Sequence, residues 1–175
     1  KYQQMKNIKK QEGVGMVEVL VALLLLAIGV LGYTALQLKA VEAGEEALLR
    51  SQATLLLRGL TESMRVNPQG QSFYSEKVQS YAGISSSPKE PKPCIDVTCT
   101  AEQMASYDAF LVARSAFNVG INITMATCPG IKSTNRQCLF AGWGGTKFSA
   151  GKYNTCMDSD GKYVNNARCL MMEAY

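Results

Sequence analysis

The chain has 175 residues, enough for one compact domain with residues to spare, and its formal net charge is +4. Residues 1–13 carry four lysines against one glutamate, so the rest of the chain is nearly neutral. A near-neutral body argues against a nucleic-acid-binding surface, which needs clustered positive charge. The absence of histidine excludes the Ser-His-Asp triad, the Cys-His dyad and imidazole metal ligands. Lysine, carboxylate or tyrosine chemistry stays possible, but most common hydrolase mechanisms are excluded. We predict no catalytic residue, no metal site and no cofactor.

One uncharged apolar segment, residues 19–36, dominates the first part of the chain. Its length is close to the ~20 residues that a helix needs to cross a bilayer. The lysines before it place the N-terminus in the cytoplasm under the positive-inside rule, and the rest of the chain on the other side of the membrane. A cleaved secretory signal is the alternative, but its apolar core is shorter and ends at a small-x-small site that this segment lacks.

An apolar stripe with helical spacing follows this segment, formed by Leu49, Ala53, Leu56, Leu60 and Met64. We expect Leu48 and Leu55 to widen the stripe, and Pro68 to end the helix. The pattern predicts one helix from about Val17 to Val66, roughly 75 Å long at 1.5 Å per residue. We expect residues 14–40 to be apolar all round and residues 41–66 to have one apolar face.

Glu18 lies at the start of the apolar segment, where an acidic side chain is costly in a membrane. The nearest basic residues, Lys9 and Lys10, are two helical turns before it. Either the carboxylate reaches water at the membrane interface, or it pairs with a cation supplied from elsewhere.

The stretch EGVGMVEVLVALLLLAIGVLG, residues 12–32, resembles the class III signal of type IV pilins and related pseudopilins. In that family a prepilin peptidase cleaves after a glycine behind a short basic leader, the new N-terminal residue is methylated, and a glutamate is the fifth mature residue. The resemblance implies that residues 1–13 are the leader, Gly13 precedes the cleaved bond, Val14 is the N-methylated terminus and Glu18 is that glutamate. In this family the first mature residue is most often Phe, whereas this chain has Val14 at that position. Cleavage after the second glycine, Gly15, would leave Glu18 in third place.

The resemblance also supplies a cation for Glu18. Cleavage before Val14 frees an α-amino group, which is positively charged near neutral pH because its reference pKa is about 7.7–8.0. We expect the carboxylate of Glu18 in one subunit to neutralise this amine in a neighbour. The pair would also set the register of assembly, because a subunit out of step leaves a buried charge unpaired.

Residues 67–175 are expected to form a periplasmic globular head. Residues 67–99 are rich in Pro, Ser and Gly and predict a long surface connection. Thr100 and Gln103 form a capping-box pattern that opens a helix over residues 101–116. Alternating sequence predicts strands at 119–127 and 138–143, and residues 168–174 are a candidate third strand. The predicted class is α+β: a long N-terminal helix and a small disulfide-bonded head with an antiparallel sheet packed on the second half of the helix.

All six cysteines lie in the second half of the chain, without CxxC spacing. An even number of scattered cysteines indicates disulfides in an oxidising compartment. Sequence proximity alone predicts the pairs Cys94–Cys99, Cys128–Cys138 and Cys156–Cys169, although other connectivities remain open.

Four short patterns have both a structural and a functional interpretation. Gly29 and Gly32 either allow close packing against another helix or let the helix stretch locally. Residues 158–161 start like a calcium loop but lack its distal glutamate, so a turn is favoured. Residues 122–124, Asn-Ile-Thr, match the N-glycosylation sequon. They lie in a predicted strand, so we favour a chance match over a glycosylation site. The Gly-Trp-Gly-Gly run at 142–145 is either a ligand-binding edge or, the favoured interpretation, a core tryptophan at a strand end.

The strings RVNPQG (65–70) and CTAEQMASYDAF (99–110) resemble PilV-type minor pilins, the type IV pilus modification proteins. The resemblance implies a structural subunit, not an enzyme, that primes pilus assembly and sits at the pilus tip, with adhesion and twitching motility as its associated activities. The implied partners are other minor pilins, the major pilin, prepilin peptidase, the bacterial inner membrane and a tip adhesin. The implied location is the inner membrane with the head in the periplasm, and then the extracellular pilus.

Three other functions fit parts of the sequence. A type II secretion pseudopilin shares the whole N-terminal signal. An uncleaved single-pass membrane protein with a periplasmic binding head would keep residues 1–13. A DNA-uptake receptor in a competence pilus is disfavoured by the nearly neutral head.

Overall fold

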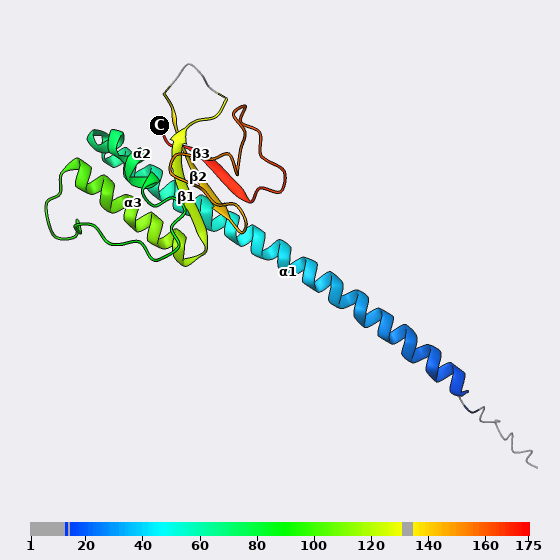
Figure 1. The fold of residues 1–175 in the computed structure, drawn as a ribbon. Coiled ribbons are helices and arrows are strands. Elements are labelled where there is room, and N and C mark those ends of the chain that lie inside the picture. Colours follow the sequence, from blue (N-terminus) through cyan, green and yellow to red (C-terminus); the bar gives the residue numbers. More distant parts are fainter. Residues whose placement is uncertain (1–12, 14, 131–134) are drawn as a thin grey trace, which may run out of the picture. The chain divides into compact units, whose positions relative to one another are not determined.

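The structure is a computed structural model that describes residue 13, residues 15–130 and residues 135–175, and it divides into two compact units. The first unit is Lys1–Gly44, and the second, called the head below, is Glu45–Tyr175. Helix α1, Met16–Val66, contributes to both units (Figure 1). It matches the helix that the sequence predicted from about Val17 to Val66.

The part of α1 in the first unit is long and apolar enough to cross a membrane, judged by length and composition, and its apolar window is not buried within the chain. Gly29 and Gly32 lie in this segment, and a Cβ added at either position would meet no atom within 4 Å. Close packing at these glycines would therefore involve another molecule.

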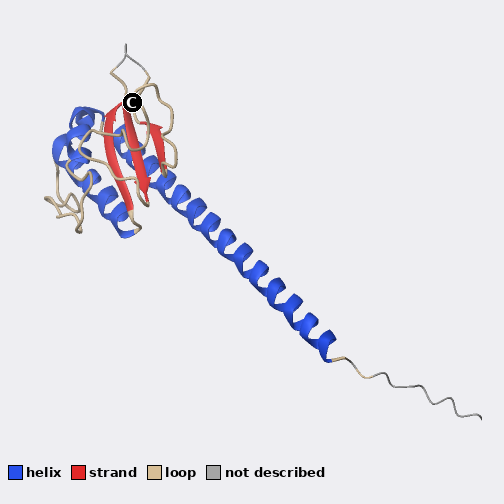
Figure 2. Ribbon diagram, turned by 45° about the vertical axis from the view of Figure 1, so that its right-hand side comes forward, coloured by secondary structure: helices blue, strands red, loops and turns tan. Residues whose placement is uncertain are grey.

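The head contains a three-stranded antiparallel sheet and three helical segments besides the end of α1 (Figure 2). The strands are β1 (Ile121–Thr127), β2 (Gln137–Trp143) and β3 (Cys169–Glu173), in the order β1-β2-β3. The helical segments are η1 (Pro68–Gly70), α2 (Gln71–Gln79) and α3 (Ala101–Asn118). These elements confirm the predicted α+β class.

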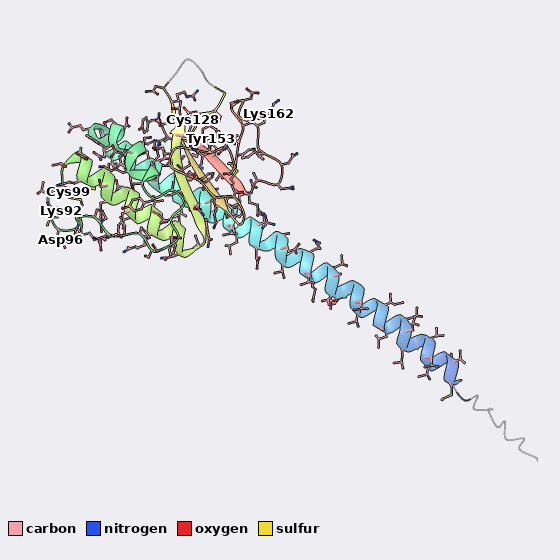
Figure 3. All side chains as sticks on the ribbon, in the orientation of Figure 1. Lys92, Asp96, Cys99, Cys128, Tyr153 and Lys162 are labelled. Atoms are coloured by element: carbon pink, nitrogen blue, oxygen red, sulfur yellow. A yellow bond between two sulfur atoms is a disulfide. The ribbon has the colours of Figure 1, made fainter. Side chains whose placement is uncertain are left out.

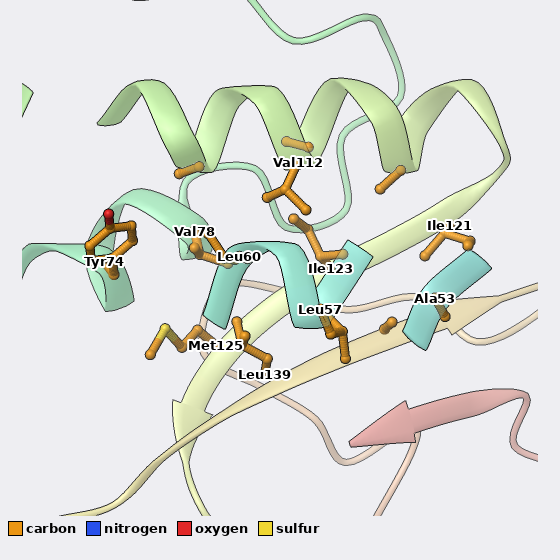
Figure 4. Packing of buried hydrophobic residues seen from close by; sticks show 14 of the residues in the cluster. Ala53, Leu57, Leu60, Tyr74, Val78, Val112, Ile121, Ile123, Met125 and Leu139 are labelled. Atoms are coloured by element: carbon orange, nitrogen blue, oxygen red, sulfur yellow. The ribbon is translucent and has the colours of Figure 1, made fainter. Parts of the chain in front are cut away.

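The helices pack on one face of the sheet, and this contact forms the main core (Figure 4). Ile123 and Met125 of β1 and Leu139 of β2 are nearly or fully buried against the helices. From α1 the core takes Ala53, Leu57, Leu60 and Met64. Strand residues two apart share one face, which is why alternate residues of β1 and β2 meet the helices.

The opposite face of the sheet is covered by the chain that links β2 to β3. The ring of Phe140 in β2 stacks on the ring of Tyr153, with centroids 4.6 Å apart. Phe148 meets the Phe140 ring edge-on, with centroids 6.4 Å apart. Figure 3 labels Tyr153 beside the sheet. A Cβ at Gly142 would lie 2.9 Å from the Phe148 ring, so glycine is required for this close approach. The sheet is thus covered on both faces.

The structure contains three disulfides, Cys94–Cys99, Cys128–Cys138 and Cys156–Cys169, which is the pairing that sequence proximity predicted. The second closes the hairpin between β1 and β2, and the third joins the chain over the sheet to the first residue of β3. Cys99 lies with Lys92 and Asp96 on the segment before α3 (Figure 3). Each bond closes a short local loop.

The buried stripe of α1 differs from the predicted one. Leu48 and Leu55, expected to widen the stripe, are 58% and 67% exposed. Leu57 is fully buried, while Leu56 is only partly buried. The prediction was wrong about this face because several leucines are adjacent on the helix, and only contact with the sheet and α3 selects which of them are covered.

The predicted surface connection over residues 67–99 is also wrong in its first part, because it contains η1 and α2. Tyr74 and Val78, four residues apart on one side of α2, are completely buried in the core. A Cβ at Gly70 would lie within 2.7 Å of both the Asn67 side chain and the Ala101 carbonyl oxygen, so only glycine fits where α2 begins. Two buried side chains in a polar stretch were too weak a signal for a helix.

The other predicted helix and strands are present in the structure, and their observed bounds differ from the predicted bounds by no more than two residues. The Thr100 capping box is present: its hydroxyl accepts from the Gln103 backbone N–H at 3.2 Å, and the Gln103 side chain accepts from the Thr100 N–H at 3.0 Å. Helix α3 runs two residues further than predicted, and β1 starts two residues later. Gly120, with a φ of +72°, makes the turn between them.

We predict that Leu57→Ala destabilises the head by about 2–5 kcal/mol, because it leaves a cavity in the core. Leu55→Ala, two residues away and exposed, should change the free energy of unfolding by no more than about 0.5 kcal/mol. Denaturant unfolding of the full chain in detergent, followed by the fluorescence of the single tryptophan, Trp143, measures both. Equal losses for the two variants would contradict the observed packing.

Candidate functional site

Helix α1 begins immediately after the two glycines of the predicted processing signal. Gly13 and Gly15 both precede the helix, and the Gly15 carbonyl oxygen accepts from the backbone N–H groups of Glu18 at 2.9 Å and Val19 at 3.3 Å. Val14, the predicted methylated N-terminus, lies outside the described residues, as do residues 1–12. The predicted cleavage position is therefore next to the helix start and not inside the helix.

Glu18 lies in the first turn of α1 and its side chain is exposed. The N-terminal end of a helix carries partial positive charge from its unpaired N–H groups, which favours a carboxylate there. The next ionisable side chain along the helix is Tyr33, and the next charged one is Lys39. Within the described part of α1, Glu18 is thus the only charged side chain before Lys39, at the start of a long apolar surface.

Large apolar side chains are exposed all round the helix that follows Glu18. Leu20, Leu24 and Leu31, for example, are between 59% and 69% exposed. Exposure of such an apolar surface to water is unfavourable, so we expect lipid or another protein to cover it. Once it is covered, a carboxylate at its edge loses water and needs a cation.

Two family models match the chain in consecutive stretches. The prokaryotic N-terminal methylation motif matches residues 8–34, and the type IV pilin Tt1218-like model matches residues 35–110. The chain belongs to the type IV pilin family. No curated protein and no solved structure matches it.

The methylation motif includes all three residues singled out for processing and assembly in this pilin, Gly13, Val14 and Glu18. Their individual roles stay predictions. The second match covers the part of α1 after Thr34, η1, α2 and most of α3, so it ends before the sheet. The sheet and the two disulfides of its loops are therefore described by the structure alone.

The pilin head holds the end of β2 against α1 through a polar contact. The indole Nε1–H of Trp143 donates to the carboxylate of Glu46 at 2.8 Å. The Arg50 guanidinium lies 3.5 Å from the same carboxylate and 5.8 Å from the centre of the Trp143 ring. Trp143 is completely buried, so its N–H needs this partner. The favoured interpretation of residues 142–145, a core tryptophan at a strand end, is confirmed.

A second polar contact joins α2 to α3 near Ser63, in the last turn of α1. The Tyr74 hydroxyl donates to the Asp108 carboxylate at 2.5 Å, and the Asn67 side chain lies 3.4 Å from the same hydroxyl. Burial raises the pKa of the Asp108 carboxyl, while the hydrogen bond from Tyr74 opposes that rise. Burial and the neighbouring carboxylate together raise the pKa of the Tyr74 hydroxyl. The pair is a hydrogen-bonded link in which the tyrosine remains neutral.

Neither of these two contacts could be predicted from the sequence. Glu46 and Trp143 are 97 residues apart, and Tyr74 and Asp108 are 34 apart. Neither pair belongs to a motif with recognisable spacing, and each exists only because packed elements bring the two residues together. A buried tryptophan always needs an acceptor, but nothing local identifies which one.

The turn at residues 158–161 is formed by Asp158, whose carboxylate accepts from the backbone N–H groups of Asp160 at 3.0 Å and Lys162 at 2.9 Å. The turn interpretation is therefore confirmed. Within the described ranges, no group of three or more His, Cys, Asp or Glu side chains could hold a metal ion.

We predict that Asp108→Asn changes the pH dependence of head stability. A carboxyl whose pKa is higher in the folded than in the unfolded state stabilises the fold most at pH values below the unfolded pKa, about 3.9, and this contribution is lost as pH rises through the folded value. Asparagine does not titrate. The free energy of unfolding of Asp108→Asn relative to the unsubstituted chain should therefore increase between about pH 3.5 and 7, measured by denaturant unfolding; a constant difference would contradict the prediction.

Proposed function

We propose that this pilin is a minor subunit of a type IV pilus that takes part in priming assembly at the inner membrane. The observation that carries the proposal is the isolated Glu18 at the start of an exposed apolar helix, directly behind a processing signal. The resemblance of residues 65–70 and 99–110 to PilV-type minor pilins supports the minor role and a place at the pilus tip beside an adhesin.

The chemistry of the start of α1 fits processing by prepilin peptidase. Cleavage after Gly13 removes the basic leader, which would otherwise keep several lysines at the end of the helix. The new amine at Val14 lies four residues before Glu18 and is positively charged near neutral pH. Methylation of this nitrogen preserves its charge. Processing thus converts the helix start into one cation and one anion, each able to pair with a neighbouring subunit.

The same apolar surface serves the subunit before and after assembly. In the membrane, lipid covers the side chains between Val19 and Leu38; in a filament, neighbouring helices cover them. Because lipid and helices are both apolar, this exchange provides little net hydrophobic driving force. The pairing of Glu18 with a neighbour's amine then favours the correct register, since any other register buries an unpaired charge.

We predict that the mature chain begins at methylated Val14. Mass spectrometry of the N-terminal peptide from cells with prepilin peptidase should find Val14 carrying one methyl group, whereas cells without the peptidase should retain residues 1–13. Gly13→Leu should block cleavage, and the control Gly15→Ala, two residues away, should not. A chain that keeps its leader in the presence of the peptidase would refute the pilus proposal.

We predict that Glu18→Ala is processed and membrane-bound but is incorporated into pili at least about tenfold less than the unsubstituted chain, because it leaves a neighbour's amine unpaired. Quantitative immunoblotting of sheared pili measures this loss. If the chain primes assembly, the number of pili per cell should also fall toward that of a strain lacking it. Glu42→Ala, which removes an exposed carboxylate later in α1, is the control and should change neither quantity.

A further inference from the structure

A pocket of about 360 Å³ lies beside β1, which is an edge strand of the three-stranded sheet. The residues that line it come from the chain after α2 (Tyr81 and Ile84), the end of α3 (Phe117), β1 (Ile121 and Ile123) and the loop after β2 (Lys147). Its volume is within the range of ligand sites in proteins, about 300–1,000 Å³. Apolar walls with a few polar groups are also typical of such sites.

Ile121 and Ile123 turn their backbone N–H and C=O groups toward the free edge of the sheet. The Trp143 N–H donates to the Arg168 carbonyl oxygen at 2.9 Å, in line with β3, so Trp143 and every second residue of β2 before it face β3. Ile121 and Ile123 are opposite two of these residues, Trp143 and Ala141. Their own backbone groups therefore point away from β2, on the side where, in the described part of the chain, no further strand pairs.

The fold itself closes the next position of this edge but leaves these two open. The carbonyl oxygen of Met125 accepts from the side chain of Gln79 at 2.8 Å. Among the described residues, the edge-facing groups of Ile121 and Ile123 make no hydrogen bond. Both residues are almost completely buried, at 3% and 2% exposure. Buried backbone N–H and C=O groups are nearly always paired in proteins, so water or a ligand must supply the partners here.

Lys147 gives the pocket a positive charge. Of the described residues that line the pocket, it alone is charged. Its ammonium group has no salt-bridge partner within the described ranges. Burial raises the pKa of the Tyr81 hydroxyl, which therefore remains protonated and able to donate a hydrogen bond. A cation without a compensating carboxylate suits an anionic group.

We propose that this pocket binds the C-terminal end of an extended peptide, whose backbone pairs with the edge of β1 at Ile121 and Ile123 and whose carboxylate lies beside Lys147. The partner is defined by its chemistry, a free C-terminal carboxylate joined to an extended peptide backbone. This site goes beyond the proposed function and does not rest on it, because residues of the head alone form the pocket.

The spacing of the edge-facing groups favours a peptide over other anions. Ile121 and Ile123 are about 6.6 Å apart along β1, at 3.3 Å per residue. An extended peptide presents N–H and C=O groups to one side at the same interval, which is how peptides add to the edges of sheets. An inorganic anion such as phosphate has no N–H donors and would leave the two carbonyl oxygens unpaired.

Edge and charge together favour the C-terminal end of a peptide. Gln79 already pairs with the Met125 carbonyl, so a peptide bonded to Ile121 and Ile123 meets this side chain and finds no free carbonyl beyond it. A terminal carboxylate pairs with Lys147, whereas a terminal amine would meet no carboxylate among the described residues of the lining.

The test is a titration of the full isotope-labelled chain in detergent with the peptide acetyl-Ala-Ala-Val, followed by two-dimensional NMR of the backbone amides. We expect saturable shifts of the Ile121 and Ile123 amide signals at peptide concentrations up to about 10 mM, because their N–H groups gain acceptors. Absence of saturable shifts at both amides, or saturable shifts confined to other parts of the chain, would overturn the proposal.

Modified peptides test the two contacts without changing the protein. The C-terminal amide of the same peptide should bind about fivefold or more weakly, because it lacks the charge that attracts Lys147. The analogue with methyl groups on its amide nitrogens should bind about tenfold or more weakly, because it cannot donate to the carbonyl oxygens of β1. Either analogue binding as tightly as the parent peptide would overturn the proposal.

Acetylvaline separates a peptide end from a small acylamino acid. It keeps the carboxylate but has one residue, so it reaches one of the two open edge positions. We expect it to bind about tenfold or more weakly than acetyl-Ala-Ala-Val. Equal affinities would make the ligand a small acylamino acid and would overturn the assignment of a peptide.

A matched pair of lysine variants tests the carboxylate contact from the side of the protein. Lys147→Met, an exposed change, should weaken binding of the free acid about fivefold and leave binding of the C-terminal amide within about twofold. Lys162→Met removes another exposed lysine between β2 and β3 that does not line the pocket, and should leave both affinities within about twofold. An equal loss for acid and amide in Lys147→Met would refute the contact.

Discussion

Burial of one side of α1 against the sheet is the constraint on which the rest of this pilin depends. Leu57, Leu60 and Met64 meet the apolar faces of β1, β2 and α3, so the head is built around the end of a helix whose first part is exposed and apolar. One continuous helix therefore has two parts that are suited to different surroundings. Its first part is suited to lipid or other helices, and its second part to the interior of a folded domain.

In the proposed function, charge determines how the exposed part of the helix is used. Apolar side chains alone would slide past one another, because they have no strong preference for one register. We propose that a single carboxylate, Glu18, at the edge of that surface makes wrong registers costly. In this proposal the Glu18 charge provides specificity and the apolar surface provides area.

The disulfides and the polar contacts of the head maintain the fold of its long loops. Two of the bonds hold the chain around the sheet, where strand pairing alone would leave long segments without support. The contacts of Trp143 with Glu46 and of Tyr74 with Asp108 join elements distant in sequence. They connect β2 to α1 and α2 to α3, so the surface of the head is held in one arrangement.

The sequence alone determined the long helix, the processing signal, the α3 capping box, the strands and the local disulfides, because each depends on residues close together in the chain. Tertiary structure alone decided that Leu57 and not Leu55 is buried, that residues 71–79 form a helix, and that Asp108 meets Tyr74. Those outcomes depend on which surfaces remain to be covered after the sheet has formed. Hydrophobic burial is non-directional, so spacing along one helix cannot select among adjacent leucines until the opposing surface is present.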